Sequence, residues 1–275
     1  MSTPETLSPS GSQISEAEAF LAKYPDTHAI DIILTDFHGI GRGTTIRRHE
    51  LESIYKSGRG LPSSIFGQDV TGEDVDDCGL VQTGGGGDGR CWPVPGTLGY
   101  LPHTGRGQLL ISMYDEDRTP HDVDPRNVFV TQVTRARKLG FTPMGAFELE
   151  FYLVDREADA DGLYHPASYA LTKRRSTLRN TMSVDEIDEM SPLFNAIYEG
   201  AKHLDLTLET LISEYGPGQY EMTIRYRNLM RAADDVIIAK RLIRTVARRF
   251  GTEAVFMPKP FGTEAGSGMH LHLSL

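Results

Sequence analysis

The sequence predicts an α+β fold with a mostly antiparallel sheet, and three observations support this prediction. Runs with strand-like alternation recur along the chain, and helical segments are interspersed among them, which is typical of α+β proteins. The 275 residues suit one large domain or two ordinary ones and are enough to bury a sizeable core. The chain shows no internal repeat that would indicate a solenoid or a propeller.

Composition excludes several classes of protein. The 28 Lys and Arg residues against 38 Asp and Glu give a net charge of −10, which disfavours binding to nucleic acids. Two cysteines are too few for a disulfide framework or a cysteine-based zinc site. No apolar run approaches the roughly 20 residues of a membrane span, and the polar N-terminus lacks a signal pattern. We therefore expect a soluble cytoplasmic protein that binds no membrane.

The N-terminal elements are predicted from caps, alternation and turn residues. The first dozen residues are polar and predict a disordered tail. A capping box of Ser15 and Glu18 predicts a short helix that stops near Pro25. A strand, a glycine turn, a returning strand and a helix are expected at residues 28–35, 39–43, 44–47 and 49–56.

A long glycine-rich stretch follows at residues 58–107 and holds 14 of the chain's 28 glycines. Long loops are uncommon in compact domains and usually serve a site or an interface, so we expect such a role here, with a flexible connector as the alternative. Residues 84–89 formally fit the G-x-G-x-x-G pattern. They follow no clear strand and open no helix, so we predict no dinucleotide site.

Longer elements are predicted from residue 108 onward. We expect a strand at 108–114 and a helix that Asp124 caps, Pro125 opens and Gly140 closes. We divide the chain into a tail and helix (1–27), a first domain (28–120) and a second domain (121–275). The second domain is expected to contain a strand at 144–154, a polar insertion at 156–183, a helix at 186–203, two strands around a Gly-Pro-Gly turn, a helix at 232–250 and two final strands.

Paired acidic residues are the first indication of chemistry. Alternation over residues 145–153 places Glu148 and Glu150 on one face of a strand, opposite the apolar side chains. Two carboxylates roughly 7 Å apart repel each other unless a cation lies between them. The Gly-Pro-Gly turn folds Glu214 back beside Glu221 and makes a second pair. A solvated strand face and a surface hairpin are the ordinary alternatives.

A histidine-bearing strand completes the predicted site. His270, His272 and Ser274 share one face of the last strand, and the glycines before it allow a ligand close to the backbone. Four carboxylates with one or two imidazoles and no cysteine favour Mg²⁺ or Mn²⁺ over a structural zinc, and indicate more than one ion.

At these residues the chain resembles the glutamine synthetase superfamily of ATP-dependent carboxylate–amine ligases. Its signatures are matched in order at Gly145–Phe151, Glu214–Glu221, Lys259–Phe261 and Gly266–Ser274, while Asp36–Gly43 resembles a motif of the family's N-terminal domain. The resemblance covers about residues 28 to 275. It implies a β-grasp domain followed by part of a catalytic domain with a curved, mostly antiparallel sheet.

The resemblance also implies roles for individual residues. One metal ion would be held by Glu150, Glu214 and Glu221, and a second by Glu148 and His270. Contacts to ATP are implied for Glu209, Tyr226, His272 and Ser274, and the loop of Gly266, Ser267 and Gly268 would receive glutamate. In the family's reaction ATP phosphorylates the γ-carboxylate of glutamate, and an amine then attacks the acyl phosphate. Members form homo-oligomeric rings with sites between subunits.

Two departures from the family pattern lead to further expectations. Leu61 stands where ammonia-using members carry an aspartate that binds ammonium, and leucine offers apolar surface instead. We therefore hypothesise an organic amine or polyamine as acceptor, unless Asp69 replaces the missing charge. Members also continue beyond the final motif, so we expect this chain to be a fragment or truncated product. Its catalytic residues would lie largely beyond Leu275, and it would be inactive alone.

Three other functions stay open from the sequence. The chain could belong to an ammonia-using glutamine synthetase, to a non-catalytic structural or regulatory member of the superfamily, or to a two-metal hydrolase that uses no nucleotide. Retention of the carboxylates argues against the non-catalytic member, because clustered carboxylates repel one another and an inactive site would gain nothing from them. The acceptor amine, the choice between Mg²⁺ and Mn²⁺, the ring size and any regulation are left open.

Overall fold

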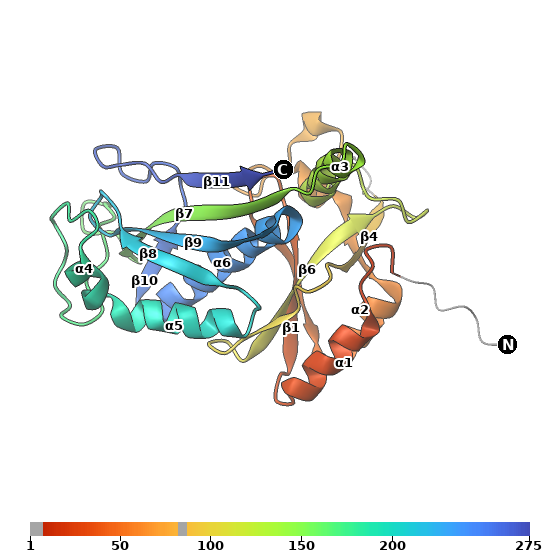
Figure 1. Ribbon diagram of the computed structural model, residues 1–275, viewed down its shortest axis with the longest axis horizontal. Helices are drawn as coiled ribbons and strands as arrows, with labels where there is room; N and C mark the ends of the chain where they lie inside the picture. Colours follow the sequence, from red (N-terminus) through yellow and green to blue (C-terminus); the bar gives the residue numbers. More distant parts are fainter. Residues whose placement is uncertain (1–7, 82–86) are drawn as a thin grey trace. The chain divides into compact units, whose positions relative to one another are not determined.

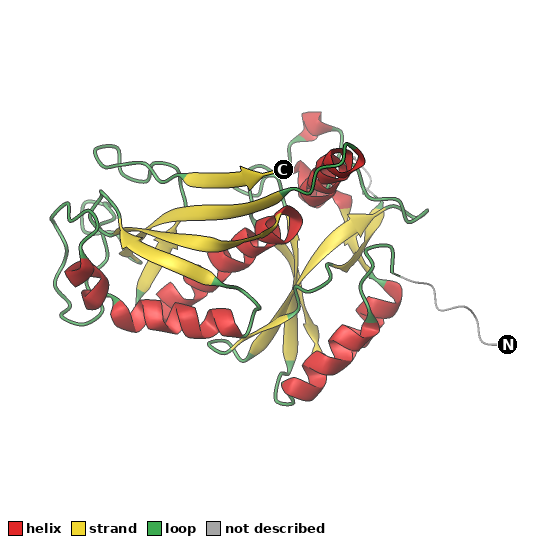
Figure 2. Cartoon of the chain, in the orientation of Figure 1, coloured by secondary structure: helices red, strands yellow, loops and turns green. Residues whose placement is uncertain are grey.

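The structure is a computed structural model that describes residues 8–81 and 87–275. By its internal contacts the chain divides into two compact units, Met1–Lys138 and Leu139–Leu275 (Figure 1). Helices and mostly antiparallel strands make up both units, so the predicted α+β class is confirmed (Figure 2). Gly84, Gly85 and Gly86 of the discounted dinucleotide pattern lie outside the described residues. No helix in the described ranges is long and apolar enough to cross a membrane.

The first unit is built on a six-stranded sheet. The order is β2-β1-β6-β4-β3, with β5 also paired to β6. Only β1 and β6 run parallel among the described pairs of this sheet. The strands are β1 (Ala29–Thr35), β2 (Gly41–Arg47), β3 (Arg59–Pro62), β4 (Asp88–Pro93), β5 (Gly99–Leu101) and β6 (Arg106–Tyr114). The hairpin expected around residues 39–43 is confirmed, whereas the β-grasp assignment of this unit stays a prediction.

The glycine-rich stretch is not one long loop. It contains β3, β4 and β5, together with 3₁₀ turns at Ser63–Gly67 and Asp76–Cys78. These strands are short and carry glycines, so they lack the alternation by which strands are recognised in a sequence. Gly89 illustrates the constraint, because a Cβ added there would lie 2.3 Å from Met113 Sδ. The glycines therefore serve close packing of this sheet as well as its turns.

Helices α1 (Ile14–Lys23), α2 (Leu51–Ser57) and α3 (Pro125–Lys138) complete the first unit. Its core is formed by alternate aliphatic residues of β1 and β6 with the buried residues of α1 and α2. Ile32, Leu109 and Leu51 are each at most 1% exposed. Full burial of one such side chain contributes about 1.5–3 kcal/mol, so this cluster holds the short strands together.

Two N-terminal expectations are wrong. Residues 8–12 are not a disordered tail, because Ser8 and Ser12 are buried and Ser10 Oγ donates a 2.6 Å hydrogen bond to the Pro93 carbonyl. The predicted capping box is also absent, since α1 begins at Ile14 with no side-chain cap. Glu16 in its first turn accepts a hydrogen bond from the backbone of Gly96 instead. Contacts distant in sequence thus decide this region.

The second unit is built on a five-stranded antiparallel sheet. Its strands are β7 (Met144–Asp155), β8 (Leu208–Ser213), β9 (Gln219–Asn228), β10 (Thr252–Val255) and β11 (Met269–Ser274). Strand β7 is central, with β9 along one edge (Figure 1). The other edge is shared, since β11 pairs with residues 144–149 and β10 with residues 152–155.

Helices cover the apolar face of this sheet. They are α4 (Val184–Glu189), α5 (Ser191–Lys202) and α6 (Leu229–Arg249). Phe151 of β7, Tyr220 of β9 and Phe194 of α5 form a chain of ring contacts with centroids 6.3 Å and 4.9 Å apart. Because side chains alternate along a strand, Glu148, Glu150 and Glu221 point from the opposite face.

The helix expected at residues 186–203 is two helices. Helix α4 ends at Glu189 and α5 starts at Ser191, with Pro192 in its first turn. Proline has no amide hydrogen, so Pro192 cannot donate to the Asp188 carbonyl and continue the earlier helix. The break therefore falls where the covalent structure of proline requires it, and Ser183 caps α4 by accepting from Glu186 N.

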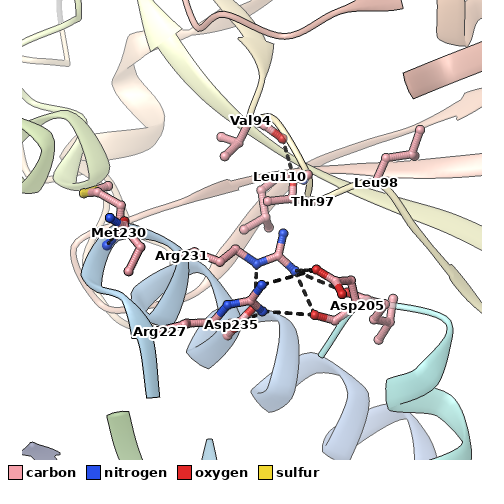
Figure 3. Close-up of polar contacts among 12 residues, drawn as sticks. Val94, Thr97, Leu98, Leu110, Asp205, Arg227, Met230, Arg231 and Asp235 are labelled. Atoms are coloured by element: carbon pink, nitrogen blue, oxygen red, sulfur yellow. Dashed lines mark hydrogen bonds and ion pairs between the residues drawn. The ribbon is translucent and has the colours of Figure 1, made fainter. Parts of the chain in front are cut away.

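A buried aspartate ties α6 to the end of β9. Asp235 is fully buried, its Oδ1 accepts from Arg231 Nε at 2.8 Å, and its Oδ2 accepts from Arg227 Nη1 at 3.0 Å (Figure 3). Both guanidinium groups also donate to the Asp205 carbonyl oxygen, in the turn after α5. Through these two guanidinium groups, the Asp235 carboxylate links α6 to the end of β9 and to the turn after α5.

We expect Asp235→Ala to destabilise the second unit by about 3 kcal/mol, because it removes the buried anion of two partly buried guanidinium groups and leaves them only the exposed carboxylate of Asp205. Denaturant unfolding followed by circular dichroism measures this loss. Glu199→Ala is the matched control, since it breaks the exposed pair of Glu199 with Lys202, and such pairs contribute at most about 0.5 kcal/mol. Equal losses of unfolding free energy in the two variants would show that Asp235 contributes no more than an exposed ion pair.

Candidate functional site

The register of β7 with its two neighbours gathers the acidic residues. Glu150 lies opposite Glu221 of β9, and Glu148 lies opposite Thr223 of β9 on one side and His270 of β11 on the other. Glu148, Glu221 and His270 each offer one ligand atom, and these atoms lie within 4.8 Å of one another. Three residues distant in sequence are therefore placed as a possible metal site.

Glu214 approaches this cluster through the tight turn between β8 and β9. The backbone of Glu214 donates to the Gln219 carbonyl at 2.8 Å, and Gln219 N donates to the Gly216 carbonyl at 2.9 Å. Two glycines make the turn possible, because Gly218 has a φ of 73° and a Cβ on Gly216 would lie 2.1 Å from the Tyr152 hydroxyl. The turn thus returns Glu214 toward Glu150 and Glu221.

The gathered charges perturb one another. Burial, followed by the charges of Glu148, Glu214 and Glu150, raises the pKa of Glu221 to about 7. Burial and then the Glu150 charge raise the pKa of Glu214. The pKa of Glu148 is instead lowered, chiefly by its hydrogen bond with His272. The pKa values of two carboxyl groups are thus raised when no metal is bound. A divalent cation bound among them would neutralise their negative charge.

Glu148 lies between two imidazoles. Its Oε2 lies 3.0 Å from His270 Nδ1, and its Oε1 lies 2.9 Å from His272 Nε2. Both histidines are exposed, so their rings are accessible to a ligand. His270 and His272 were predicted to contact metal and ATP respectively, and in this arrangement they share a single carboxylate.

The backbone at Gly268 approaches the carboxylate cluster closely. A Cβ added to Gly268 would lie 3.0 Å from Glu150 Oε1 and 3.5 Å from His270 Nε2. A Cβ there would crowd this carboxylate oxygen, so glycine permits the close backbone approach. The donor set of carboxylate oxygens and imidazole, without cysteine, fits Mg²⁺ or Mn²⁺.

The loop before β11 is pinned to the same sheet. Tyr152 Oη donates to the Ala265 carbonyl at 2.7 Å, Gln219 Nε2 to the Gly266 carbonyl at 3.0 Å, and Glu150 N to the Gly268 carbonyl at 3.2 Å. The hydroxyl oxygen of Ser267 is buried and has no hydrogen-bond partner within the described ranges. Gly266, Ser267 and Gly268, predicted to receive glutamate, therefore lie next to the carboxylate cluster.

An ion pair fixes the start of this loop. Arg179 Nη2 lies 3.0 Å from both carboxylate oxygens of Glu264, and its guanidinium lies over the ring of Tyr215. Arg179 belongs to the polar insertion at residues 156–183, whose sequence indicates no role. Neither the composition nor the spacing of the insertion indicated this contact, because it joins residues 85 positions apart.

The other predicted site residues lie further out. Glu209 is paired loosely with Arg225 at 3.9 Å, Tyr226 is 46% exposed and Ser274 is exposed on β11. In the described part of the chain, none of these three makes a hydrogen bond or an ion pair with the carboxylates. Their assignment to ATP stays a prediction.

Leu61 and Asp69 belong to the first unit. Leu61, on β3, is half-buried and packs against the core of that unit. Asp69 Oδ1 accepts hydrogen bonds from the backbones of Thr71 and Glu73 and so closes a turn. The role of Leu61 in acceptor choice, and of Asp69 as a substitute for the missing charge, stay predictions.

Comparison with known proteins identifies the family. The family model described as "Glutamine synthetase, catalytic domain" matches residues 122–275. The chain is 38% identical to gamma-glutamylputrescine synthetase PuuA of Escherichia coli K12, over 94% of its own length and 56% of that protein. It is 29% identical to glutamate–isopropylamine ligase of a Pseudomonas species, over 96% of its own length and 57% of that protein. The chain therefore belongs to the glutamine synthetase family, as its four ordered motifs predicted.

Solved structures show the same fold. The GmaS/ADP complex aligns with a TM-score of 0.77 at 22% identity, covering 93% of this chain and 54% of the other. A novel glutamine synthase homolog aligns with a TM-score of 0.75 at 25% identity, covering 90% and 55%. The chain spans about half the length of the curated relatives it matches. The family match begins at residue 122 and the contact-based division falls after residue 138, so the boundary near residue 120 stays a prediction.

The raised pKa of Glu221 predicts a pH-dependent stability. A carboxyl group whose pKa is raised by folding from 4.5 to about 7 stabilises the folded chain below pH 4.5 and loses this contribution as the pH rises through 7. In EDTA, Glu221→Gln should therefore be more stable than the parent at pH 8, on the order of 1 kcal/mol after solvent screening, and equal to it at pH 4.5.

Thermal unfolding in EDTA across this pH range measures the difference. With Mn²⁺ at pH 8 the order should reverse, because glutamine is a poorer ligand than a carboxylate. Glu199→Gln, which neutralises an exposed carboxylate, should follow the parent at every pH. A Glu221→Gln curve parallel to that of the parent would show that the carboxylates do not repel one another.

Proposed function

We propose that this chain serves an ATP-dependent ligase that joins the γ-carboxylate of glutamate to an organic amine. The convergence of Glu148, Glu150, Glu214 and Glu221 on one sheet face, beside the loop before β11, is the observation that carries the proposal. The relatives' names support the acceptor class, since one is a gamma-glutamylputrescine synthetase and another a glutamate–isopropylamine ligase.

Divalent cations fit the carboxylate cluster. Glu150, Glu214 and Glu221 would hold one ion, and Glu148 with His270 a second. Bound there, Mg²⁺ or Mn²⁺ would offset the negative charge of the nucleotide phosphates during transfer. The close approach of the Gly268 backbone to Glu150 Oε1 and His270 Nε2, which the lack of a Cβ permits, is compatible with backbone near a bound ligand.

Glutamate would bind at the loop of Gly266, Ser267 and Gly268. The buried hydroxyl of Ser267 lacks a partner in the described residues and is available to a polar substrate group. In the proposed reaction the γ-phosphoryl group of ATP passes to a γ-carboxylate oxygen of glutamate, and ADP leaves. The amine nitrogen then attacks the acyl carbon, loses a proton and displaces phosphate.

The outer residues would complete the substrate sites. Glu209, Tyr226, His272 and Ser274 are exposed on β8, β9 and β11, where a nucleotide could reach them. Leu61 would give the acceptor site an apolar surface in place of a carboxylate, which disfavours ammonium relative to an amine with a carbon chain. We further propose a homo-oligomer with sites between subunits.

An amine panel tests the proposed activity on the protein that contains this chain. With glutamate and ATP, we expect release of ADP that depends on Mg²⁺ or Mn²⁺, with putrescine or isopropylamine giving a kcat/KM at least tenfold above that for ammonia. A preference for ammonia would instead indicate a glutamine synthetase. ADP release that depends on no amine, or an absence of metal-dependent nucleotide binding, would contradict the ligase.

Leu61→Asp tests the acceptor hypothesis. A carboxylate at this position should favour the small cation, so the ratio of kcat/KM for ammonia to that for putrescine should rise by about 10-fold, equivalent to about 1.4 kcal/mol. Ile65→Asp is a matched control, because Ile65 is another half-buried residue packed against the same core. The same change of ratio in both variants would mean that Leu61 has no specific role.

A further inference from the structure

The buried side chain of Gln219 hydrogen-bonds three separate parts of the candidate site. It is the first residue of β9, lies opposite Tyr152 of β7 and is 1% exposed. Its Oε1 accepts from Gly216 N at 3.0 Å, while its Nε2 donates to Glu150 Oε2 at 3.1 Å and to the Gly266 carbonyl at 3.0 Å. One buried amide therefore contacts the turn, the carboxylate cluster and the loop before β11.

The orientation of this amide follows from its partners. The backbone of Gly216 offers a donor, whereas Glu150 and Gly266 offer acceptors. A flipped amide would place its oxygen against a carboxylate and a carbonyl, and its nitrogen against an N–H group. Both amide hydrogens and the amide oxygen are thus used, and the side chain has one satisfied arrangement.

The contact with Glu150 decides how that carboxylate is presented. Gln219 holds Glu150 Oε2, so the other oxygen, Oε1, is left on the side of Gly268 and the imidazole of His270. A hydrogen bond to a carboxylate is among the stronger ones in proteins, and it restricts the rotation of the group. Glu150 is therefore oriented for a cation by a residue that would not touch the cation itself.

The other side chains that hold the loop make no hydrogen bond to Glu150 in the described part of the chain. Tyr152 donates to Ala265, and Arg179 pairs with Glu264. Among the described side chains, Gln219 is the one that hydrogen-bonds both a predicted metal ligand and the predicted glutamate loop. A change at the Glu150 carboxylate therefore reaches the Gly266 carbonyl through one side-chain amide, in addition to the backbone bond from Glu150 N to the Gly268 carbonyl.

We propose that Gln219 is a positioning residue that couples Glu150 to the loop Ala265–Gly268. A cation bound at Glu150 and an ordered loop then favour each other. Each holds the Gln219 amide in the one orientation that satisfies both of its partners. This inference rests on the proposed function for the identity of the two ligands, and goes beyond it by naming the residue that links their sites.

Two variants of the full chain test the coupling. Gln219→Met keeps the length of the side chain and removes its hydrogen bonds, and Tyr152→Phe is the matched control that removes one loop contact without touching Glu150. Mn²⁺ binding is measured by titration without nucleotide, and amide exchange of residues 264–268 is measured with and without Mn²⁺. Circular dichroism establishes that each variant is folded.

We expect Gln219→Met to weaken Mn²⁺ binding by about 10- to 100-fold, as for other residues that orient a metal ligand. It should also speed amide exchange in the loop and abolish the protection that Mn²⁺ gives there. Tyr152→Phe should speed exchange in the loop but leave Mn²⁺ affinity unchanged, because the Tyr152 hydroxyl donates to Ala265 and not to Glu150. Should Gln219→Met fail to fold, Gln219→Asn retains the amide on a shorter arm and should give the same two effects.

Parental Mn²⁺ affinity and parental loop protection in a folded Gln219 variant would overturn the inference. Loss of Mn²⁺ binding in Tyr152→Phe to the same degree would also overturn it, because any loosening of the loop would then suffice. A parent chain that binds no Mn²⁺ would overturn the proposed function instead. In that case metal-free exchange at Gly266 and Gly268 still decides whether Gln219 holds the loop.

Discussion

The second unit depends on the pairing of β7 with strands on both of its edges. With β9 on one side and β11 on the other, a single register places Glu150 opposite Glu221 and Glu148 opposite His270. A shift by one residue on either edge would turn these side chains toward the helices and the apolar residues toward solvent. The buried ring contacts on the helical face therefore also specify the acidic face.

That arrangement has an electrostatic cost in the absence of a cation. Burial and mutual repulsion raise the pKa of Glu221 and Glu214, whereas Glu148 is compensated by two imidazoles. The rest of the unit holds the carboxylates in place against this repulsion. Gly216, Gly218 and Gly268 allow the close backbone approach, and the Asp235 network anchors the end of β9 from the helical side.

Much of the fold could be predicted from local pattern. The strand at residues 144–155 was recognised because its alternation is strict, and α3 because Asp124, Pro125 and Gly140 mark its ends. The start of α1 was mispredicted because Glu16 bonds to Gly96, 80 positions away, in place of a local cap. The three short strands between residues 58 and 107 were missed because they are defined by pairing with β6 and with each other.

For the candidate site, the sequence by itself determined which carboxylates lie together, since strand alternation places Glu148 and Glu150 on one face, and a turn of two glycines returns Glu214 toward Glu221. It also determined the family through four ordered motifs. Only the tertiary structure decided how those residues are oriented. The hydrogen bonds of Gln219 and Arg179 join segments 47 to 85 positions apart, and no local pattern encodes contacts over such separations.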